Sequence, residues 1–218
     1  MVYRGFEKHA ERYDSWYRRH PLIFECEART IRALRLKGRG LSVGVGTGIL
    51  DSQARVQIGV DPSMNMVKRV IEYGIEPVRA VGEHLPFKGQ VFDFALITVT
   101  LCFLDSPRKT FLDVRRVLRS GGEIAVCIVP KDSVWGKTYM EKARAGNIFY
   151  RHAHFYSLSE LESMLLECFF KVVDRKASLS YSPSEPPRLE EPAEEEGKGF
   201  VCLKAVKTRK ISGLKQYG

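Results

Sequence analysis

Three glycines alternate with small residues directly after a short apolar run. Gly44, Gly46 and Gly48 lie in LSVGVGTGIL, which we expect to be a strand, a turn and the start of a helix. Glycine lets the backbone turn sharply and approach a ligand closely, and a helix N-terminus offers unpaired N–H groups. The stretch fits G-x-G-x-G, not the G-x-G-x-x-G of dinucleotide-binding folds, because Ile49 occupies the sixth position. No phosphate-binding G-x-x-x-x-G-K-[ST] occurs, so a P-loop is not expected.

Polar side chains recur where further predicted strands end. Asp61 closes the run VQIGVD, and a carboxylate there can accept hydrogen bonds from both hydroxyls of a ribose. The segment VGEHLPF follows the third run, and Thr98 ends the fourth run, FDFALIT. Ligands of open α/β sheets bind beyond the carboxyl ends of the strands, so we expect one pocket to use all of these residues.

Alternating strand and helix patterns surround these motifs. Two helical patterns open the chain within about residues 5–36, and from Leu41 short β-rich runs alternate with helices, as in parallel βαβ units. Helices are expected over Ser63–Tyr73, from Ser106 to a stop at Gly121-Gly122, and over Ser133–Ala145. A capping box at Ser157 predicts one more helix. The last two strands are expected in CFFKVVDRKASLSY and GFVCLKAVK and form a pair. This makes seven strands in one α/β domain.

The order of these motifs resembles the class I S-adenosylmethionine-dependent methyltransferases. The most similar group is the type 11 family, which includes the C-methyltransferases of ubiquinone and menaquinone biosynthesis. The resemblance rests on FEKHAERYDSWY, VGVGTG, GVDPS, GEHLPF, FDFALIT and VLRSGGEIAV, which occur in the family's order between Phe6 and Val126. It implies a Rossmann-like, doubly wound, seven-stranded sheet with an antiparallel last strand, and S-adenosyl-L-methionine as cofactor.

The resemblance also implies roles for individual residues. The glycines would approach the methionine and ribose, Asp61 would hold the ribose hydroxyls, and Tyr13 would close over the cofactor. The complete cofactor-binding set implied in this way is Tyr13, Gly44, Val45, Gly46, Thr47, Gly48, Asp61, Pro62, Ser63, Met64, Gly82, Glu83, His84 and Thr98. The chain departs from the family at Ser42 and Val81, where an acidic residue is usual, and each change removes a hydrogen bond worth roughly 1.5–3 kcal/mol.

Methyl transfer requires mainly that a nucleophile be aligned with the methyl group, and no metal is expected. A general base would assist a hydroxyl, thiol or acidic carbon, and the candidates are His152, His154 and Asp105. The alternative is that the histidines are surface or polar-core residues and that Asp105 is a turn residue. Tyr17 and Tyr139 are candidate substrate contacts in aromatic-rich segments, although such stripes also pack helices against a core.

Composition limits the class of protein. The 218 residues carry a net charge of +9, with 44% hydrophobic residues, and no apolar run is long enough to cross a bilayer. The charged N-terminus lacks a secretory signal, so a cytoplasmic protein is expected. The five cysteines show no paired spacing and are expected to be reduced core residues.

The chain is expected to hold one domain over residues 1–207. Four prolines and several glutamates at about residues 182–198 predict a mobile loop, and residues 208–218 form a basic tail. A small-molecule acceptor is favoured. The alternatives are an RNA or protein methyltransferase that uses the tail, and a cofactor-binding module without catalytic activity. The oligomeric state cannot be read from the sequence.

Overall fold

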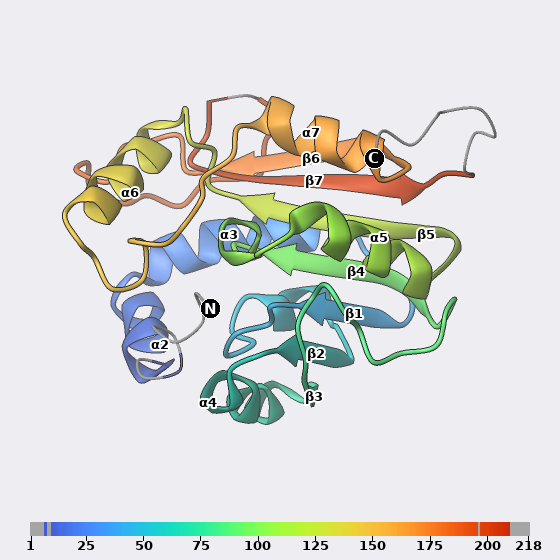
Figure 1. Cartoon of the computed structure of the whole chain (residues 1–218). Helices are drawn as coiled ribbons and strands as arrows, with labels where there is room; N and C mark the ends of the chain where they lie inside the picture. Colours follow the sequence, from blue (N-terminus) through green and yellow to red (C-terminus); the bar gives the residue numbers. More distant parts are fainter. Residues whose placement is uncertain (1–6, 8–9, 196, 210–218) are drawn as a thin grey trace.

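A seven-stranded sheet forms the centre of the computed structural model, which describes residue 7 and residues 10–195 and 197–209 (Figure 1). Its order is β3-β2-β1-β4-β5-β7-β6. The strands are β1 (Gly40–Val43), β2 (Ile58–Asp61), β3 (Glu76–Arg79), β4 (Phe92–Thr98), β5 (Leu118–Ile128), β6 (Phe170–Ser178) and β7 (Phe200–Lys207). β1 to β5 pair in parallel, whereas β7 is antiparallel to both β5 and β6. The doubly wound sheet with an antiparallel last strand is therefore confirmed.

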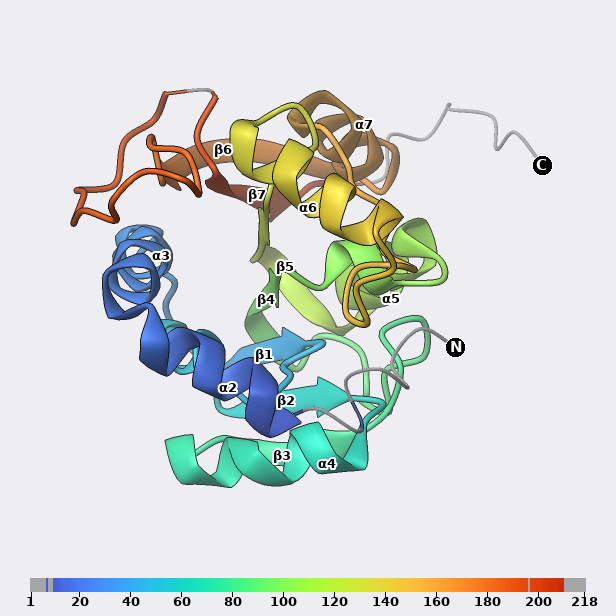
Figure 2. The same cartoon turned by 90° about the vertical axis from the view of Figure 1, so that its left-hand side faces the viewer.

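Helices cover both faces of the sheet (Figure 2). The helices are α2 (Ala10–Arg19), α3 (Pro21–Ala33), α4 (Met64–Val67), α5 (Pro107–Val117), α6 (Val134–Arg144) and α7 (Leu158–Glu167), with 3-10 turns η1 (Asp51–Ala54), η2 (Lys68–Tyr73) and η3 (Leu101–Phe103). Phe111 of α5 and Leu161 of α7 pack on one buried face with Ile97 and Val126. Ile31 of α3 packs on the opposite face. Each face thus has its own core.

Three local expectations are corrected. The glycine-rich turn leads into η1, not into an α-helix, and Ser63–Tyr73 divides into α4 and η2. Helix α5 ends at Val117, and Gly121-Gly122 lie inside β5. The β4–β5 register jumps there, from Phe92 opposite Leu118 to Phe94 opposite Glu123. Gly121 has a φ of 73°, so these glycines form an irregularity in the strand pairing and do not stop the helix.

The predicted capping box at Ser157 is confirmed, whereas the helix cap predicted at Ser106 is not. The Ser133 hydroxyl accepts the N–H of Gly136, and Ser157 and Glu160 form the predicted capping box. Pro107 is the first residue of α5, but the side chain of Ser106 makes no capping hydrogen bond.

Two cysteines form a disulfide, which corrects the expectation that all five are reduced. Cys127 of β5 and Cys202 of β7 are bonded, while Cys26, Cys102 and Cys168 are free thiols. The two bonded residues lie directly opposite each other in the antiparallel β5–β7 pair. They are 75 residues apart in sequence, so only strand pairing brings them together.

The described part of segment 182–198 contains no helix, and one isolated bridge joins Ala193 to Ala177. The Cys26 thiol contacts the backbone on both sides of Leu189, at Arg188 and at Glu190. These contacts place the segment against α3.

Helix α2 lies beyond the carboxyl ends of the parallel strands (Figures 1 and 2). The Arg69 guanidinium, in η2, holds it through an ion pair of 2.6 Å with the buried carboxylate of Asp14. Within the described residues, no helix is long and apolar enough to cross a membrane.

Candidate functional site

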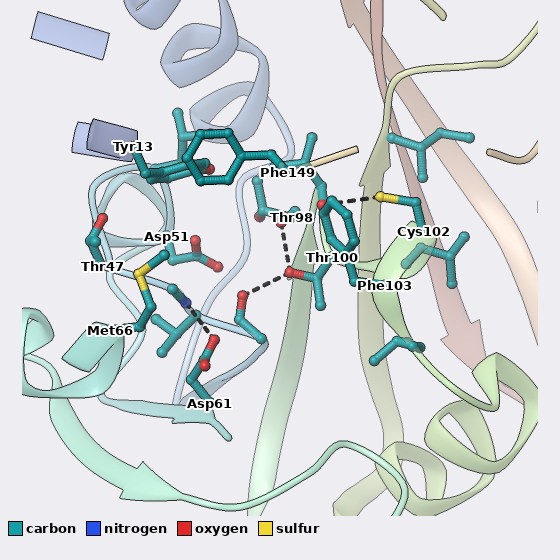
Figure 3. Close-up of a pocket in the computed structure, with 18 of the residues that line it drawn as sticks. Tyr13, Thr47, Asp51, Asp61, Met66, Thr98, Thr100, Cys102, Phe103 and Phe149 are labelled. Atoms are coloured by element: carbon teal, nitrogen blue, oxygen red, sulfur yellow. Dashed lines mark hydrogen bonds between the residues drawn. The ribbon is translucent and has the colours of Figure 1, made fainter. Parts of the chain in front are cut away.

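A cavity of about 430 Å³ opens at the carboxyl ends of β1, β2, β4 and β5. The glycine-rich turn and Asp61 line one part of it. Helices α2 and α6 and the segment after α6 contribute aromatic side chains, among them Tyr13, Tyr139 and Phe149. Figure 3 shows Asp51, Asp61 and Thr98 reaching into this space from three different elements. The expected pocket at the strand ends therefore exists.

The glycine-rich turn depends on left-handed backbone conformations. Gly44, Gly46 and Gly48 have φ values of 72°, 55° and 86°. A Cβ atom on Gly44 would lie 2.0 Å from Cγ2 of Thr100, so no other residue fits there. The Thr100 hydroxyl donates to the Gly44 carbonyl at 2.7 Å. Thr100 thereby joins the turn after β1 to the end of β4.

Asp61 anchors the same turn from the neighbouring strand. Its two carboxylate oxygens accept the backbone N–H groups of Gly46 at 3.0 Å and of Ser63 at 2.8 Å. Each oxygen keeps a second lone pair for a ligand. Burial raises the pKa of Asp61 to about 6, although both backbone hydrogen bonds lower it.

Asp51, the first residue of η1, is a second buried carboxylate at the cavity. The hydroxyl of Ser42 in β1 donates to it at 2.6 Å. Burial raises the pKa of Asp51 to about 7, against the lowering effect of the Ser42 and Thr98 hydroxyls, and the charge of Asp61 adds a smaller increase. No described Lys or Arg forms an ion pair with Asp51. The acidic group absent at position 42 is thus supplied from η1.

Glu27, on α3, is the third buried carboxylate of the cavity and is only 5% exposed. The Tyr17 hydroxyl donates to its Oε2 at 3.0 Å. Burial raises the pKa of Glu27 to about 8, and the Tyr17 hydrogen bond opposes that rise.

Aromatic rings surround this end of the cavity. The rings of Tyr13 and Tyr17 pack edge to face at 5.5 Å between centroids, and those of Tyr139 and Tyr150 stack at 4.8 Å. Burial raises the pKa of all four hydroxyls, so they stay neutral at physiological pH.

Most of the residues singled out in the sequence lie at the cavity. They are Tyr13, Tyr17, Gly44, Val45, Gly46, Thr47, Asp61, Pro62, Gly82, Glu83, Thr98, Asp105 and Tyr139. Glu83 also accepts the backbone N–H of Ser106 at 3.0 Å, at the start of α5.

The remaining candidates do not line the cavity: Gly48, Ser63, Met64, His84, His152 and His154. Ser63 is buried and caps α4. His84, His152 and His154 are exposed, and the His154 ring packs against Tyr156. The structure therefore brings neither proposed histidine base to the site.

The sequence did not point to Glu27, Asp51 or Thr100, whereas Tyr150 belongs to the aromatic-rich segment after β5 that was expected to line the substrate site. Glu27 lies among the apolar residues of a helical pattern, and its burial depends on the tyrosines of α2. The one sequence feature that marks Asp51 is its position as an acidic residue soon after the three glycines. Its contact with Ser42 of β1 depends on the turn of η1, which the sequence did not predict.

In the described part of the chain, no group of three or more His, Cys, Asp and Glu side chains is arranged to hold a metal ion.

Comparisons with known proteins agree with this geometry. The family model described as a methyltransferase domain, Methyltransf_11, matches residues 41–126. A solved S-adenosylmethionine-dependent methyltransferase from Thermotoga maritima, described as a possible histamine N-methyltransferase, is 30% identical, with a TM-score of 0.89 over 95% of this chain and 100% of its own.

Two further relatives extend the comparison. An uncharacterised protein of Methanocaldococcus jannaschii is 37% identical over 93% of this chain and 98% of its own. A phosphatidylethanolamine N-methyltransferase of Cereibacter sphaeroides is 33% identical over 41% of this chain and 49% of its own.

Proposed function

Since the chain belongs to the S-adenosylmethionine-dependent methyltransferases with a type 11 domain, we propose that it transfers the methyl group to a small molecule held in the same cavity. One observation carries the proposal. A single cavity joins the polar turn residues to an aromatic end to which α2, α6 and the segment after α6 contribute side chains. Its volume lies within the range of pockets for small ligands, about 300–1,000 Å³.

The cofactor end offers unsatisfied polar groups that fit S-adenosylmethionine. The buried Thr47 hydroxyl has no hydrogen-bond partner among the described residues, which leaves it available to a ligand. Asp61 keeps acceptor capacity for a ribose diol. Asp51, without a cation of the protein, suits the ammonium group of the methionyl part.

S-adenosylmethionine, when bound, supplies an electrophilic methyl group on a sulfonium, whose release leaves a neutral thioether. The chain has to hold an acceptor against that methyl group and exclude water. The aromatic rings of α2 and α6 line the same cavity as the polar turn, so they can contact an acceptor there and reduce its exposure to water. Alignment of this kind contributes ~7–11 kcal/mol to catalysis.

The names of two related proteins support a small-molecule acceptor but do not identify the compound that this chain methylates. The Thermotoga protein is described with histamine and the Cereibacter protein with phosphatidylethanolamine. Transfer to RNA or protein through the basic tail is the other class that the sequence raised. Residues 210–218 of that tail lie outside the described part of the chain, and no described contact favours it.

The test is isothermal titration with S-adenosylmethionine and S-adenosylhomocysteine, followed by transfer of a tritiated methyl group to amines, thiols, phenols, quinone precursors and bulk tRNA. We expect both cofactor forms to bind and one small-molecule class to be labelled. Asp61→Ala should lose most of the cofactor affinity, because it removes the ribose acceptor and the anchor of Gly46. Failure of the wild-type protein to bind either form would refute the proposal, and labelling of tRNA alone would refute the small acceptor.

A further inference from the structure

Glu27 is a buried carboxylate that faces a cavity without a cation to balance it. No described Lys or Arg side chain pairs with it, and Tyr17 is the one described side chain that donates to it. Ionised carboxylates are rarely buried without a cationic or hydrogen-bonding partner, because the cost of desolvation is high. Burial favours the neutral form of Glu27 in the ligand-free protein, and a cationic ligand in the cavity would supply the missing partner and favour the ionised carboxylate.

The cofactor's ammonium group already has a suitable partner in Asp51. Asp51 is the first residue of η1, accepts a hydrogen bond from Ser42 and has its pKa raised by the charge of Asp61. Glu27 lies on α3, and only burial and the Tyr17 hydroxyl shift its pKa. The two carboxylates therefore come from different elements of the cavity wall and have different hydrogen-bond partners.

Tyrosines from three segments face Glu27. Tyr13 and Tyr17 come from α2, Tyr139 from α6 and Tyr150 from the segment that follows, and the Glu27 charge raises the pKa of each. Glu27 also raises the pKa of Cys26 and Tyr181. A carboxylate beside several tyrosines at one cavity can bind an ammonium ion through its charge, and the aromatic rings of that cavity can add cation–π contacts.

The cations near this end are exposed. Lys142 lies 5.1 Å from the centroid of the Tyr139 ring, and Arg12 lies 5.8 Å from that of Phe149. Both residues are solvent-exposed, so water screens their charges and neither neutralises Glu27.

We propose that the methyl acceptor is an amine, bound as its ammonium form by the Glu27 carboxylate within the tyrosines of α2, α6 and the segment after α6. The proposal rests on the proposed methyltransferase function and names its substrate class. It also assigns Glu27 a chemical role, as the group that accepts the proton which must leave the ammonium before transfer.

The reaction balances as follows. The ammonium R–NH₃⁺ passes one proton to the Glu27 carboxylate, which gives R–NH₂ and a neutral carboxylic acid. The nitrogen lone pair forms the new N–C bond while the C–S bond breaks, and the sulfur keeps the bonding electron pair. The products are R–NH₂⁺–CH₃ and a thioether, and Glu27 returns its proton to solvent when the product leaves. The raised pKa of Glu27 makes it a stronger proton acceptor than an exposed glutamate.

The experiment compares ligands that differ only in their head group. One trio is phenethylamine, 2-phenylethanol and 3-phenylpropionate, and a second is hexylamine, 1-hexanol and hexanoate. Transfer of a tritiated methyl group is measured for each compound with the full chain, and binding is titrated with S-adenosylhomocysteine present. We expect the amine of at least one trio to be methylated at least tenfold faster than its alcohol or carboxylate. Equal labelling of the three head groups, or no labelling of either amine, would overturn the proposal.

Two variants separate charge from structure. Glu27→Gln keeps the shape and should lower kcat/KM for the amine at least tenfold, with S-adenosylhomocysteine affinity within twofold of wild type. Tyr17→Phe removes the hydrogen bond that Tyr17 donates to Glu27 but leaves the carboxylate, so it should keep the preference for the amine over the alcohol. For each variant, the affinity for S-adenosylhomocysteine and the melting temperature show whether the protein is folded.

The outcomes distinguish the two proposals. Loss of cofactor affinity in Glu27→Gln would place Glu27 in the cofactor subsite and overturn the amine assignment. Unchanged amine transfer in that variant would also overturn it. Failure of the wild-type chain to bind S-adenosylmethionine would instead reject the proposed function itself.

Discussion

Asp51 of η1 places a carboxyl group beside Ser42, the position in β1 where an acidic residue was expected. The chain has Ser42 where the family resemblance leads to the expectation of an acid, and the sequence alone predicts weakened cofactor binding. In the structure the Ser42 hydroxyl donates to Asp51, so the serine orients a carboxylate that η1 delivers. A carboxyl group therefore lies at this part of the cavity, contributed by η1 and not by β1.

The role of Asp51 can be tested with two ligands. Asp51→Asn keeps an oxygen that can accept from Ser42 but removes the charge. We expect S-adenosylhomocysteine to bind about 10- to 150-fold more weakly, the equivalent of a charge-assisted hydrogen bond of roughly 1.5–3 kcal/mol. Methylthioadenosine lacks the methionyl ammonium, so its affinity should change less than about twofold. Equal losses for the two ligands in calorimetric titrations would contradict the assignment.

At the scale of elements, the position of α2 decides whether the site is enclosed. This helix contributes Tyr13 and Tyr17 to the cavity. Its buried Asp14 pairs with Arg69 of η2, and Arg69 also pairs with Glu11. Removal of Arg69 would leave the Asp14 carboxylate buried without a cation, which is more costly than the loss of an exposed ion pair.

Arg69→Ala should therefore loosen α2. We expect amide hydrogen exchange in residues 10–19 to become about tenfold faster or more, because the cost of the unpaired carboxylate favours local opening. Arg18→Ala is the matched control, since the Arg18–Glu11 pair is exposed on both sides. Mass-spectrometric exchange should show little change in that variant. Similar protection of α2 in both variants would show that Arg69 does not hold the helix.

The β5–β7 disulfide gives a second element-scale prediction. The chain has five cysteines, of which Cys127 and Cys202 are bonded and three are free. Alkylation in denaturant without reductant should label three thiols per chain, and reductant should raise the count to five. Intact mass spectrometry measures both counts. Five labelled thiols without reductant would contradict the bond, and Cys202→Ala should leave Cys127 open to labelling.

At the scale of the whole molecule, the three cavity carboxylates link stability to pH. Burial raises the pKa of Asp61, Asp51 and Glu27 to about 6, 7 and 8. In the unfolded chain all three ionise near their ordinary values of about 4. Between pH 4 and 8 the folded state therefore binds more protons than the unfolded state. The free energy of unfolding must fall as pH rises through this window.

We therefore expect the melting temperature of the ligand-free protein to decrease between pH 5.5 and 8. Each carboxylate contributes at most about 1.4 kcal/mol per pH unit. Glu27→Gln removes the group that titrates highest, so its curve should be flatter between pH 7 and 8. S-adenosylhomocysteine should stabilise the protein more at pH 8 than at pH 5.5, because it pairs with ionised Asp51. A melting temperature that rises with pH in ligand-free protein would contradict the assigned pKa values.

Local and periodic information was sufficient for the strands and most helices, whereas the doubly wound sheet with an antiparallel last strand was predicted from the family resemblance. Strand and helix alternation, turn glycines and caps are determined within a few residues, so the seven strands and the Ser157 capping box followed from the sequence. Parallel strands place their carboxyl ends at one edge, which is why the convergence of Gly44, Asp61 and Thr98 could also be predicted.

Tertiary structure decided which residues meet across distant elements. The pairing of Cys127 with Cys202 depends on strand register, and the return of Asp51 to Ser42 depends on a short turn. The burial of Glu27 among tyrosines of α2, α6 and the segment after α6 depends on how these elements pack over the sheet edge. No repeating pattern in the sequence predicts these contacts. Each contact joins residues on different elements, and the way those elements pack decides whether the residues meet. The sequence thus determined the strands and the glycine-rich turn, whereas the tertiary structure determined which carboxyl groups are buried at the cavity.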